Sequence, residues 1–552
     1  MQKLSSILRE HRKPLLVLLL TWGIFFSVLF GRMISLKSDG LYVGHQNVWS
    51  DWALHGAMAN SFAFKPPNQW FDNHPLYAGG KFTYPWLTNF ISGMLMRVGF
   101  SLPLSFIIPS IIFSLMLIGG MYALFFQTLR SKAKAVLAIT FYFLSSGLGF
   151  WNFLKEFVAD PSLSAITYPI RDFGRFDQFD WYAGNVTLGL LLPQRAFLLG
   201  VTIGVWVIAI LFWILENKNL PEPKKHKLLL AIGLAAGIMP IAHAHSFIAL
   251  IIITGLMSIV NYRRWRLLLW YVIPATLLSG LLYYIFVAGG IERESFIRLL
   301  PGWTAPGGLF SWIHMWLLLW GTMLPAAIAG FFLMRRSMSK NVQTFFIASF
   351  AIFALGNLVL FQPVQWDNTK LFWWAYLGFS GLAAYITAWL WKNSRIIAII
   401  LVVTLTATGI LESIRIQRIS KHSFQVTNTD DIDLGLAIRA QTDPSAVFLT
   451  APKHNHFVMM WGIRPILMGY TGWVWNYGFK YEQRERDLAT IYLGAPEALS
   501  LLQKYKISYI VIGPPEINDL KADENYFQAR FPLAFKNNSN RIYDTRQLFP
   551  NR

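Results

Sequence analysis

The chain has 552 residues, 55% of them hydrophobic and only 14% charged, and its mean hydropathy is +0.43. This composition excludes a soluble globular protein and predicts a polytopic α-helical membrane protein. The net charge of +20 lies mostly in short loops before residue 412, which is typical of membrane topology and excludes a nucleic-acid-binding face.

About eleven apolar stretches match the length of a membrane-spanning helix, which needs roughly 20 apolar residues. They lie at 14–33, 103–129, 133–152, 195–215, 228–241, 246–260, 267–288, 311–333, 342–361, 371–391 and 395–411. The number of spans between 228 and 260 stays open, because Pro240 interrupts a short apolar run there. No small-residue cleavage site follows the first stretch, so we expect an uncleaved helix and not a secretory signal.

Basic residues cluster before the first stretch and in five of the connections between the stretches, and all six clusters fall on one side of the predicted membrane. They are Arg9–Lys13, Arg130–Lys134, Lys218–Lys227, Arg263–Arg266, Arg335–Lys340 and Lys392–Arg395. The positive-inside rule makes this side cytoplasmic. We therefore expect the N-terminus inside the cell and, with an odd number of spans, the C-terminal region outside.

The first outer loop, at about 35–102, is too polar to cross lipid and too long for a simple turn. Asp51 opens a predicted amphipathic helix in this loop, within WSDWALHGAMANSFAF. A carboxylate at that place suits a general base for a hydroxyl acceptor or a metal ligand, and it equally suits a helix N-cap. His55 lies four residues on, on the same helix face, where it either orients Asp51 or packs.

The same loop continues with HPLYAGGKFTYP, which carries three further candidate substrate-binding residues: His74, Tyr77 and Tyr84. Two consecutive glycines allow a sharp turn in this segment. A re-entrant loop anchored by aromatic rings is the alternative interpretation. The helix predicted after it, from Trp86 to Val98, is too short to span and is expected in the membrane interface.

The second outer loop, at about 153–194, places Asp177 and Asp180 among aromatic residues. Carboxylates accept hydrogen bonds from sugar hydroxyls and rings stack on apolar sugar faces, so the pattern suits sugar binding. A solvated loop of self-paired charges is the alternative. Arg195 follows at the start of a span, where a lipid phosphate or a packed salt bridge would offset its cost.

Three later segments add polar residues near the predicted membrane. His243 and His245 are two positions apart and do not share a face of a regular helix, so a metal site formed by both would require the helix to break there. A contact with the substrate or a lipid headgroup is favoured over a metal site. Asp367 and Lys370 lie in a short outer loop, where the lysine either clamps a phosphate or snorkels. Arg293 adds a further outer cation.

The hydropathy falls after about residue 411, which divides the chain into a transmembrane domain (1–411) and an extracytoplasmic domain (412–552). Three buried strands are predicted at 446–452, 464–470 and 507–516. An amphipathic helix at 495–506 precedes the last of them. Strand, helix and strand together predict a small soluble α/β domain.

The sequence lacks the signatures of several enzyme classes. It has no phosphate-binding Gly-rich loop ending in Lys-Ser/Thr, no HExxH and no Gly-x-Ser-x-Gly, so ATP-driven transport and serine hydrolysis lack support. It also has no Cys, which excludes disulfides, zinc–thiolate sites and thiol catalysis.

The arrangement resembles the GT-C superfamily of integral-membrane glycosyltransferases. The shared features are an acidic residue in a long, helical first outer loop (WSDWALH), the HPLY…TYP segment, about eleven spans and a soluble C-terminal outer domain. The sequence departs from the acidic pair of many members, because Trp52 follows Asp51.

The resemblance implies inverting transfer from a polyprenyl-phosphate sugar to a glycan, lipid or protein acceptor at the outer face of a bacterial or archaeal plasma membrane. It makes Asp51 the catalytic base, and Lys370, Arg195 or Arg293 partners of the donor phosphate. Some members use a divalent metal and others do not, so a metal stays possible and no cofactor is required. Membrane lipids are expected partners and nucleic acid is not.

Two other functions stay open. A transporter or flippase for a lipid-linked glycan would use the same cations without needing a base. A non-catalytic membrane protein of envelope assembly would use its outer domain to bind partners.

Overall fold

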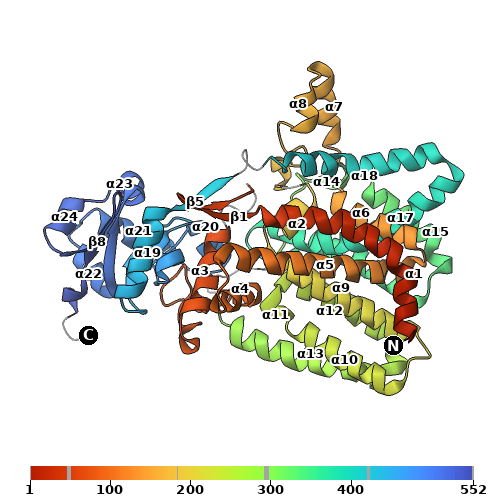
Figure 1. The fold of residues 1–552 in the computed structure, drawn as a ribbon, viewed down its shortest axis with the longest axis horizontal. Helices are drawn as coiled ribbons and strands as arrows, with labels where there is room; N and C mark the ends of the chain where they lie inside the picture. Colours follow the sequence, from red (N-terminus) through yellow and green to blue (C-terminus); the bar gives the residue numbers. More distant parts are fainter. Residues whose placement is uncertain (1, 46–50, 183, 291–296, 419–422, 550–552) are drawn as a thin grey trace. The chain divides into compact units, whose positions relative to one another are not determined.

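The computed structural model describes residues 2–45, 51–182, 184–290, 297–418 and 423–549, which are mostly helical and form two compact units (Figure 1). Unit 1 joins Met1–Gly31, Ser110–Ile285 and Ile297–His422. Unit 2 joins Arg32–Pro109, Phe286–Phe296 and Ser423–Arg552. The first long loop therefore folds with the C-terminal region, although hundreds of residues separate them in the chain.

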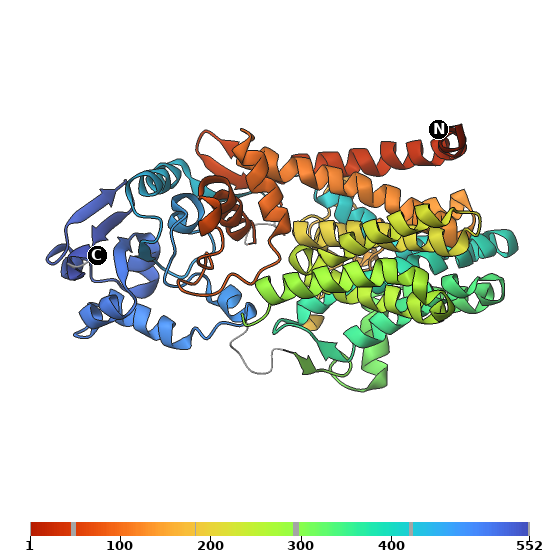
Figure 2. The same ribbon diagram turned by 90° about the horizontal axis from the view of Figure 1, so that it is seen from below.

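Long apolar helices make up most of unit 1, and Figure 2 shows many of them side by side. The helices that overlap the predicted apolar stretches are α1 (Gln2–Leu18), α2 (Ile24–Gly31), α5 (Leu102–Leu129), α6 (Lys132–Leu144), α9 (Arg195–Glu216), α10 (Glu222–Gly237), α11 (Met239–Ala242), α12 (Ala244–Val260), α13 (Trp265–Phe286), α14 (Gly308–Trp320), α15 (Met323–Met334), α16 (Lys340–Gly356), α17 (Thr369–Asn393) and α18 (Arg395–Arg415). Helix α17 is the central one, because it is buried along most of its length against α6, α15, α16 and α18.

Among the described residues, seven helical stretches are long and apolar enough to cross a membrane, and the bent pair α14–α15 makes an eighth. Helices α12 and α16 are apolar but shorter. Each of the eleven predicted stretches overlaps a helix. Two differ in form: 311–333 bends by 93° between α14 and α15, and 133–152 ends early because α6 stops at Leu144.

Shorter elements fill the connections of unit 1. They are the helices α7 (Phe150–Ala159) and α8 (Leu163–Thr167), the 3-10 helices η4 (Asp177–Phe179), η6 (Tyr262–Arg264), η7 (Arg335–Ser337) and η8 (Gln365–Asn368), the short π-helix η5 (Thr187–Leu191), and the paired strands β3 (Arg298–Leu299) and β4 (Val359–Leu360). A further short π-helix, η1 (Leu19–Gly23), joins α1 to α2 into one apolar stretch.

The first long loop contributes a sheet and two helices to unit 2. Its hairpin of β1 (Ile34–Lys37) and β2 (Gly40–Val43) pairs antiparallel with β5 (Phe424–Asn428), at the start of the C-terminal region. Helix α3 (Asp51–Phe64) packs against α4 (Leu87–Arg97) and is buried from Trp52 to Ala63. The prediction of an amphipathic α3 is therefore wrong, because the helix is enclosed on all faces.

The C-terminal region contains a four-stranded sheet in the order β6–β7–β9–β8. Strands β6 (Val447–Leu449) and β7 (Ile507–Ile512) run parallel, whereas β9 (Arg541–Asp544) and β8 (Leu533–Lys536) are antiparallel to their neighbours. The remaining elements are η3 (Pro67–Gln69), α19 (Thr429–Gln441), η10 (Val458–Gly462), α20 (Thr471–Asn476), α21 (Glu482–Tyr492), α22 (Ala498–Lys504), α23 (Pro514–Leu520), α24 (Glu524–Gln528) and η11 (Arg546–Leu548).

The predicted strand at 464–470 makes only a single bridge, between Ile466 and Phe448. Pro465 has no N–H to extend the ladder. Its carbonyl accepts from the Phe448 N–H at 2.9 Å, and the Leu467 N–H donates back to the Phe448 carbonyl at 2.9 Å. The other predicted strands correspond to β6 and β7, and the predicted helix corresponds to α22, so the small α/β region is confirmed.

One hydrophobic core holds the first long loop and the C-terminal region together. Side chains of α3, such as Leu54, Met58 and Phe62, belong to the same buried cluster as Phe448 and Val458. The burial of apolar side chains is the main stabilising term of folding. The loop is thus an internal part of unit 2.

Candidate functional site

Asp51 is the first residue of α3 and is half-buried. The positive end of the helix dipole stabilises a negative charge at this place. Residues 46–50, which precede it, lie outside the described residues. His55 follows one helical turn later, buried, and its Nδ1 accepts a hydrogen bond from Asn89 Nδ2 of α4 at 3.1 Å. Two helices therefore fix the imidazole one turn from the carboxylate.

Tyr84 and His74 lie around this helix in unit 2. The rings of Tyr84 and His55 have centroids 5.8 Å apart, and Tyr477 contacts both Tyr84 and His74. Burial lowers the pKa of His74 to about 3, so its ring is neutral. Its Nδ1 accepts a hydrogen bond from the Leu76 N–H at 3.2 Å, which holds the HPLY turn.

Tyr77 is buried in the same turn and makes a hydrogen bond, a ring-stacking contact and a cation–π contact. Its hydroxyl donates to the Lys480 carbonyl at 2.7 Å, its ring stacks on Phe479 at 4.7 Å, and the Arg484 guanidinium lies 3.5 Å from the ring centroid. These contacts attach the turn to the C-terminal region. In this arrangement His74 and Tyr77 position the loop.

The two predicted carboxylates of the second long loop, Asp177 and Asp180, are each bonded to a neighbouring side chain in the same loop. Arg175 Nε donates to Asp177 Oδ1 at 2.6 Å, and the Tyr182 hydroxyl donates to Asp180 Oδ1 at 2.9 Å. Trp181 lies between these residues and is completely buried. It packs in a cluster of tryptophan rings formed with Trp303, Trp316, Trp366 and Trp373.

A pair of carboxyl groups anchors this loop to helix α18. Glu412 is buried, accepts a hydrogen bond from Asn185 Nδ2 at 2.7 Å and shares a further hydrogen bond with Asp172. Loss of hydration raises the pKa of Asp172, although the bond to Glu412 and the charge of Arg415 oppose this. The pair thus links the second long loop to the last turns of α18.

Sequence reasoning missed Glu412 as a candidate functional residue. A glutamate in the last turns of an apolar helix is costly unless it is paired, which is the signal that could have found it. Its partner Asn185 gives no comparable signal, because it lies in a polar loop.

His243 and His245 stand at the junction of α11 and α12. His243 caps α12: the backbone N–H and the hydroxyl of Ser246 both donate to its Nδ1, at 3.1 and 2.8 Å. Trp374 of α17 donates to the same hydroxyl at 2.9 Å. The ring centroids of the two histidines are 5.9 Å apart, so the helix break brings them together.

Asp367 and Lys370 form a buried ion pair, with Nζ and Oδ1 2.5 Å apart, at the start of α17. Arg195 is also buried, at the first position of α9. Arg293 lies outside the described residues. Of the three predicted cations, Lys370 therefore already has a carboxylate partner.

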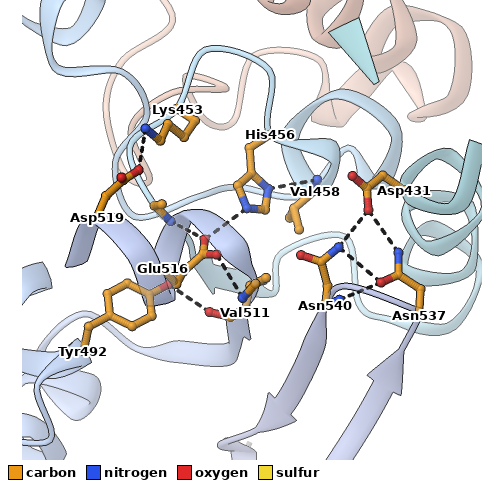
Figure 3. Close-up of polar contacts among 12 residues, drawn as sticks. Asp431, Lys453, His456, Val458, Tyr492, Val511, Glu516, Asp519, Asn537 and Asn540 are labelled. Atoms are coloured by element: carbon orange, nitrogen blue, oxygen red, sulfur yellow. Dashed lines mark hydrogen bonds and ion pairs between the residues drawn. The ribbon is translucent and has the colours of Figure 1, made fainter. Parts of the chain in front are cut away.

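A second polar network, which sequence reasoning did not predict, lies in the C-terminal region (Figure 3). Glu516 is fully buried and accepts hydrogen bonds from the backbone N–H groups of Ala451 and Gly513, at 2.7 and 3.0 Å. Nε2 of His456 lies 3.4 Å from Glu516 Oε1. Burial alone would raise the pKa of Glu516, but His456 and the backbone donors hold it below its ordinary value.

The Glu516 network borders a polar cleft of about 290 Å³. Asp431 lines its other side and accepts from Asn540 and Asn537 at 2.7 and 3.0 Å. These bonds join α19 to the turn between β8 and β9, so they fix the shape of the cleft. The residues lie far apart in the sequence, which is why no motif revealed them.

The structure offers no candidate metal centre in the parts of the chain that it describes. No three His, Asp or Glu side chains are grouped there in a way that could hold a metal ion. The carboxylates and histidines singled out above occur at most in pairs.

Comparison with known proteins identifies the fold. No family model matches the chain, and no curated protein matches its sequence. Among solved structures, ArnT from Cupriavidus metallidurans bound to undecaprenyl phosphate is similar over 96% of this chain and 97% of its own, with a TM-score of 0.53 and 10% identity.

The Archaeoglobus fulgidus oligosaccharyltransferase, in a complex with Zn and sulfate, is similar over 89% of this chain and 67% of its own, with a TM-score of 0.53 and 12% identity. Both are GT-C glycosyltransferases. The chain therefore has the GT-C fold, and with its apolar helices it is an integral membrane protein.

Proposed function

We propose that this chain of GT-C fold is a membrane glycosyltransferase that moves a sugar from a polyprenyl-phosphate donor to an acceptor at the extracytoplasmic face. The observation that carries the proposal is the likeness to ArnT, which extends over nearly the whole of both chains. That structure holds undecaprenyl phosphate, a lipid of the proposed donor class. Fold alone permits several functions, so the site residues must supply the chemistry.

Asp51 is the proposed general base. Its carboxylate takes the proton of the acceptor hydroxyl as the hydroxyl oxygen attacks the anomeric carbon. The bond between that carbon and the phosphate oxygen breaks, and the bonding electrons leave with polyprenyl phosphate. This single displacement inverts the anomeric configuration. The half-buried carboxylate and the imidazole of His55, held by Asn89, support this role.

A cation must offset the charge that develops on the departing phosphate. Arg195 is the best candidate, because a guanidinium binds phosphate through two parallel hydrogen bonds and this one is buried at a helix start. Lys370 is a weaker candidate, because the contact with Asp367 already neutralises its charge. Arg293 stays a candidate on sequence grounds alone.

Charge topology supports the proposed orientation. The basic connections lie in the cytoplasm, which puts the N-terminus inside and both long loops and the C-terminal region outside a bacterial or archaeal plasma membrane. The acceptor would be a glycan, a lipid or a protein. The predicted substrate contacts of His55, Tyr84, His243, His245, Asp177 and Asp180 belong to this proposal.

Transfer can be measured in proteoliposomes that contain the purified chain. The donor is undecaprenyl phosphate carrying a radiolabelled sugar, tested over a panel of sugars, and an envelope extract supplies the acceptor. We expect the label to leave the lipid while undecaprenyl phosphate appears in equal amount. Label that crosses the bilayer still attached to its lipid would instead identify a transporter. Intact donor with every sugar, on both sides, would contradict transferase and transporter alike.

A further inference from the structure

A strongly basic cleft lies in unit 1, and none of the proposed substrate-binding residues lines it. Two connections form it, the one between α9 and α10 and the one between α12 and α13, and its volume is about 820 Å³. Its charged lining consists of Lys218, Lys225, Arg263, Arg264, Arg266 and Glu222. Five cations thus face one carboxylate.

The cations of the cleft have few charged partners of their own. Lys225 contacts Glu222 at 2.6 Å, whereas Arg264 donates to the Leu215 carbonyl, a neutral acceptor, at 2.9 Å. Within the described part of the chain, Lys218, Arg263 and Arg266 make no ion pair. Arg263 and Arg266 are exposed. The cleft therefore retains a net positive charge that an anion can neutralise.

Aromatic rings stand beside these charges. The rings of His226 and Trp270 stack with centroids 4.8 Å apart, and the Arg266 guanidinium lies 5.4 Å from the ring centroid of Trp265. Trp265 and Trp270 are exposed. Exposed tryptophans next to basic residues are typical of the level of lipid headgroups.

The cleft lies where two apolar helical stretches begin, and therefore at a membrane boundary. The apolar stretches Glu222–Ala242 and Tyr262–Phe286 both begin at it. Helices α10 and α13 lie side by side (Figure 1), with Gly233 against the Tyr271 carbonyl and Gly237 against Leu278. Because the helices pack closely, the two basic connections at their ends are held near each other.

We propose that this cleft binds the phosphate of an anionic membrane lipid. Basic residues in loops follow from the positive-inside rule, but that rule does not require two loops about 40 residues apart to share one concave site. Basic pockets between membrane helices accept anionic headgroups. The exposed Arg263 and Arg266 bind the phosphate, and the rings of Trp265 and Trp270 lie against the glycerol and upper acyl chains.

Lipid retention by the purified full-length chain tests this site. The chain is exchanged into detergent micelles with either phosphatidylglycerol or phosphatidylcholine, and bound lipid is counted by native mass spectrometry. We expect selective retention of phosphatidylglycerol that weakens as salt is raised, because exposed charges are screened. The double variant R263Q/R266Q should weaken retention about thirty-fold, since each basic residue near an anionic surface contributes substantially to binding.

The matched control is R335Q/R336Q, which removes two exposed arginines from another basic connection, in η7, that does not line the cleft. It should retain phosphatidylglycerol like the unaltered chain. Equal loss in both variants would reduce the effect to overall charge and overturn the site. Equal retention of phosphatidylcholine would overturn the anionic lipid. Displacement by inorganic phosphate at the same concentration would assign the cleft to free phosphate and overturn the lipid.

Discussion

Most of the polar side chains that the sequence marked as substrate contacts are bonded to neighbours within their own unit. Lys370 contacts Asp367, Asp177 contacts Arg175, and His243 caps a helix. The first two pairs are three and two residues apart in sequence, so their pairing was foreseeable. These contacts hold the three side chains in defined positions, and their roles in substrate binding stay predictions.

His74 gives a prediction about pH at the residue scale. Burial lowers the pKa of its ring to about 3, whereas in the unfolded chain the ring titrates near its ordinary value of 6.5. Below pH 6.5 only the unfolded state gains the proton, so the free energy of unfolding falls as the pH falls toward 3. The variant H74F should lose this part of the dependence, measured as a smaller drop in Tm between pH 7.5 and pH 5.

The control for this prediction is F479L, which disturbs the ring contact with His74 but removes no titratable group. It should lower Tm by the same amount at both pH values. A drop in H74F as steep as in the unaltered chain would show that the proton uptake belongs to other groups.

At the scale of elements, the pairing of the β1–β2 hairpin with β5 joins the first long loop to the C-terminal region. Gly40 makes this possible: its φ is +146°, and an added Cβ would lie 2.1 Å from the Thr427 carbonyl oxygen. No larger residue fits there without moving β5. The hairpin is thus the place where a small change should separate the two segments.

The variant G40A should lower the free energy of unfolding by about 1–3 kcal/mol, because backbone strain and a steric clash act together. Thermal unfolding and limited proteolysis of the first long loop measure the effect. G79A is the matched control, since Gly79 also has a positive φ, of +75°, but no atom lies within 4 Å of its added Cβ. Equal effects in the two variants would mean that the hairpin contributes nothing beyond local strain.

How much of an element the sequence predicts depends on where its partner lies. The apolar stretches predicted where the long helices lie, because the thickness of the membrane sets the length of a spanning helix. The hairpin was missed although Asp39-Gly40 is a known turn signal, and its third strand, β5, lies nearly 400 residues away. In the same way, Glu412 of α18 bonds to Asp172 and Asn185 in the second long loop, more than 200 residues earlier in the chain. No local pattern reveals such contacts.

For the whole molecule, hydropathy along the chain and contacts in space divide the protein differently. Hydropathy puts the first long loop with the membrane helices, because it lies between two of them. In the structure the loop shares a sheet and a hydrophobic core with the C-terminal region. The proposed base therefore sits on a helix enclosed by unit 2, which gives it a rigid support of the kind that catalytic groups require.

The central claim is that Asp51 acts as the base in sugar transfer, and replacing it by asparagine tests this most directly. Asparagine has the size and shape of aspartate and loses only the interaction of the charge with the helix dipole, about 0.3–1 kcal/mol, so α3 should keep its structure in D51N. The matched control is D72N, the same change at an exposed position of the same loop.

The measurement is the initial rate at which undecaprenyl phosphate appears from its sugar-linked form. The rate in D51N should fall about 10²-fold or more while the KM for the donor changes little, because a lost base affects the chemical step. D72N should keep the rate of the unaltered chain. A D51N rate within about twofold of the unaltered chain would contradict the account.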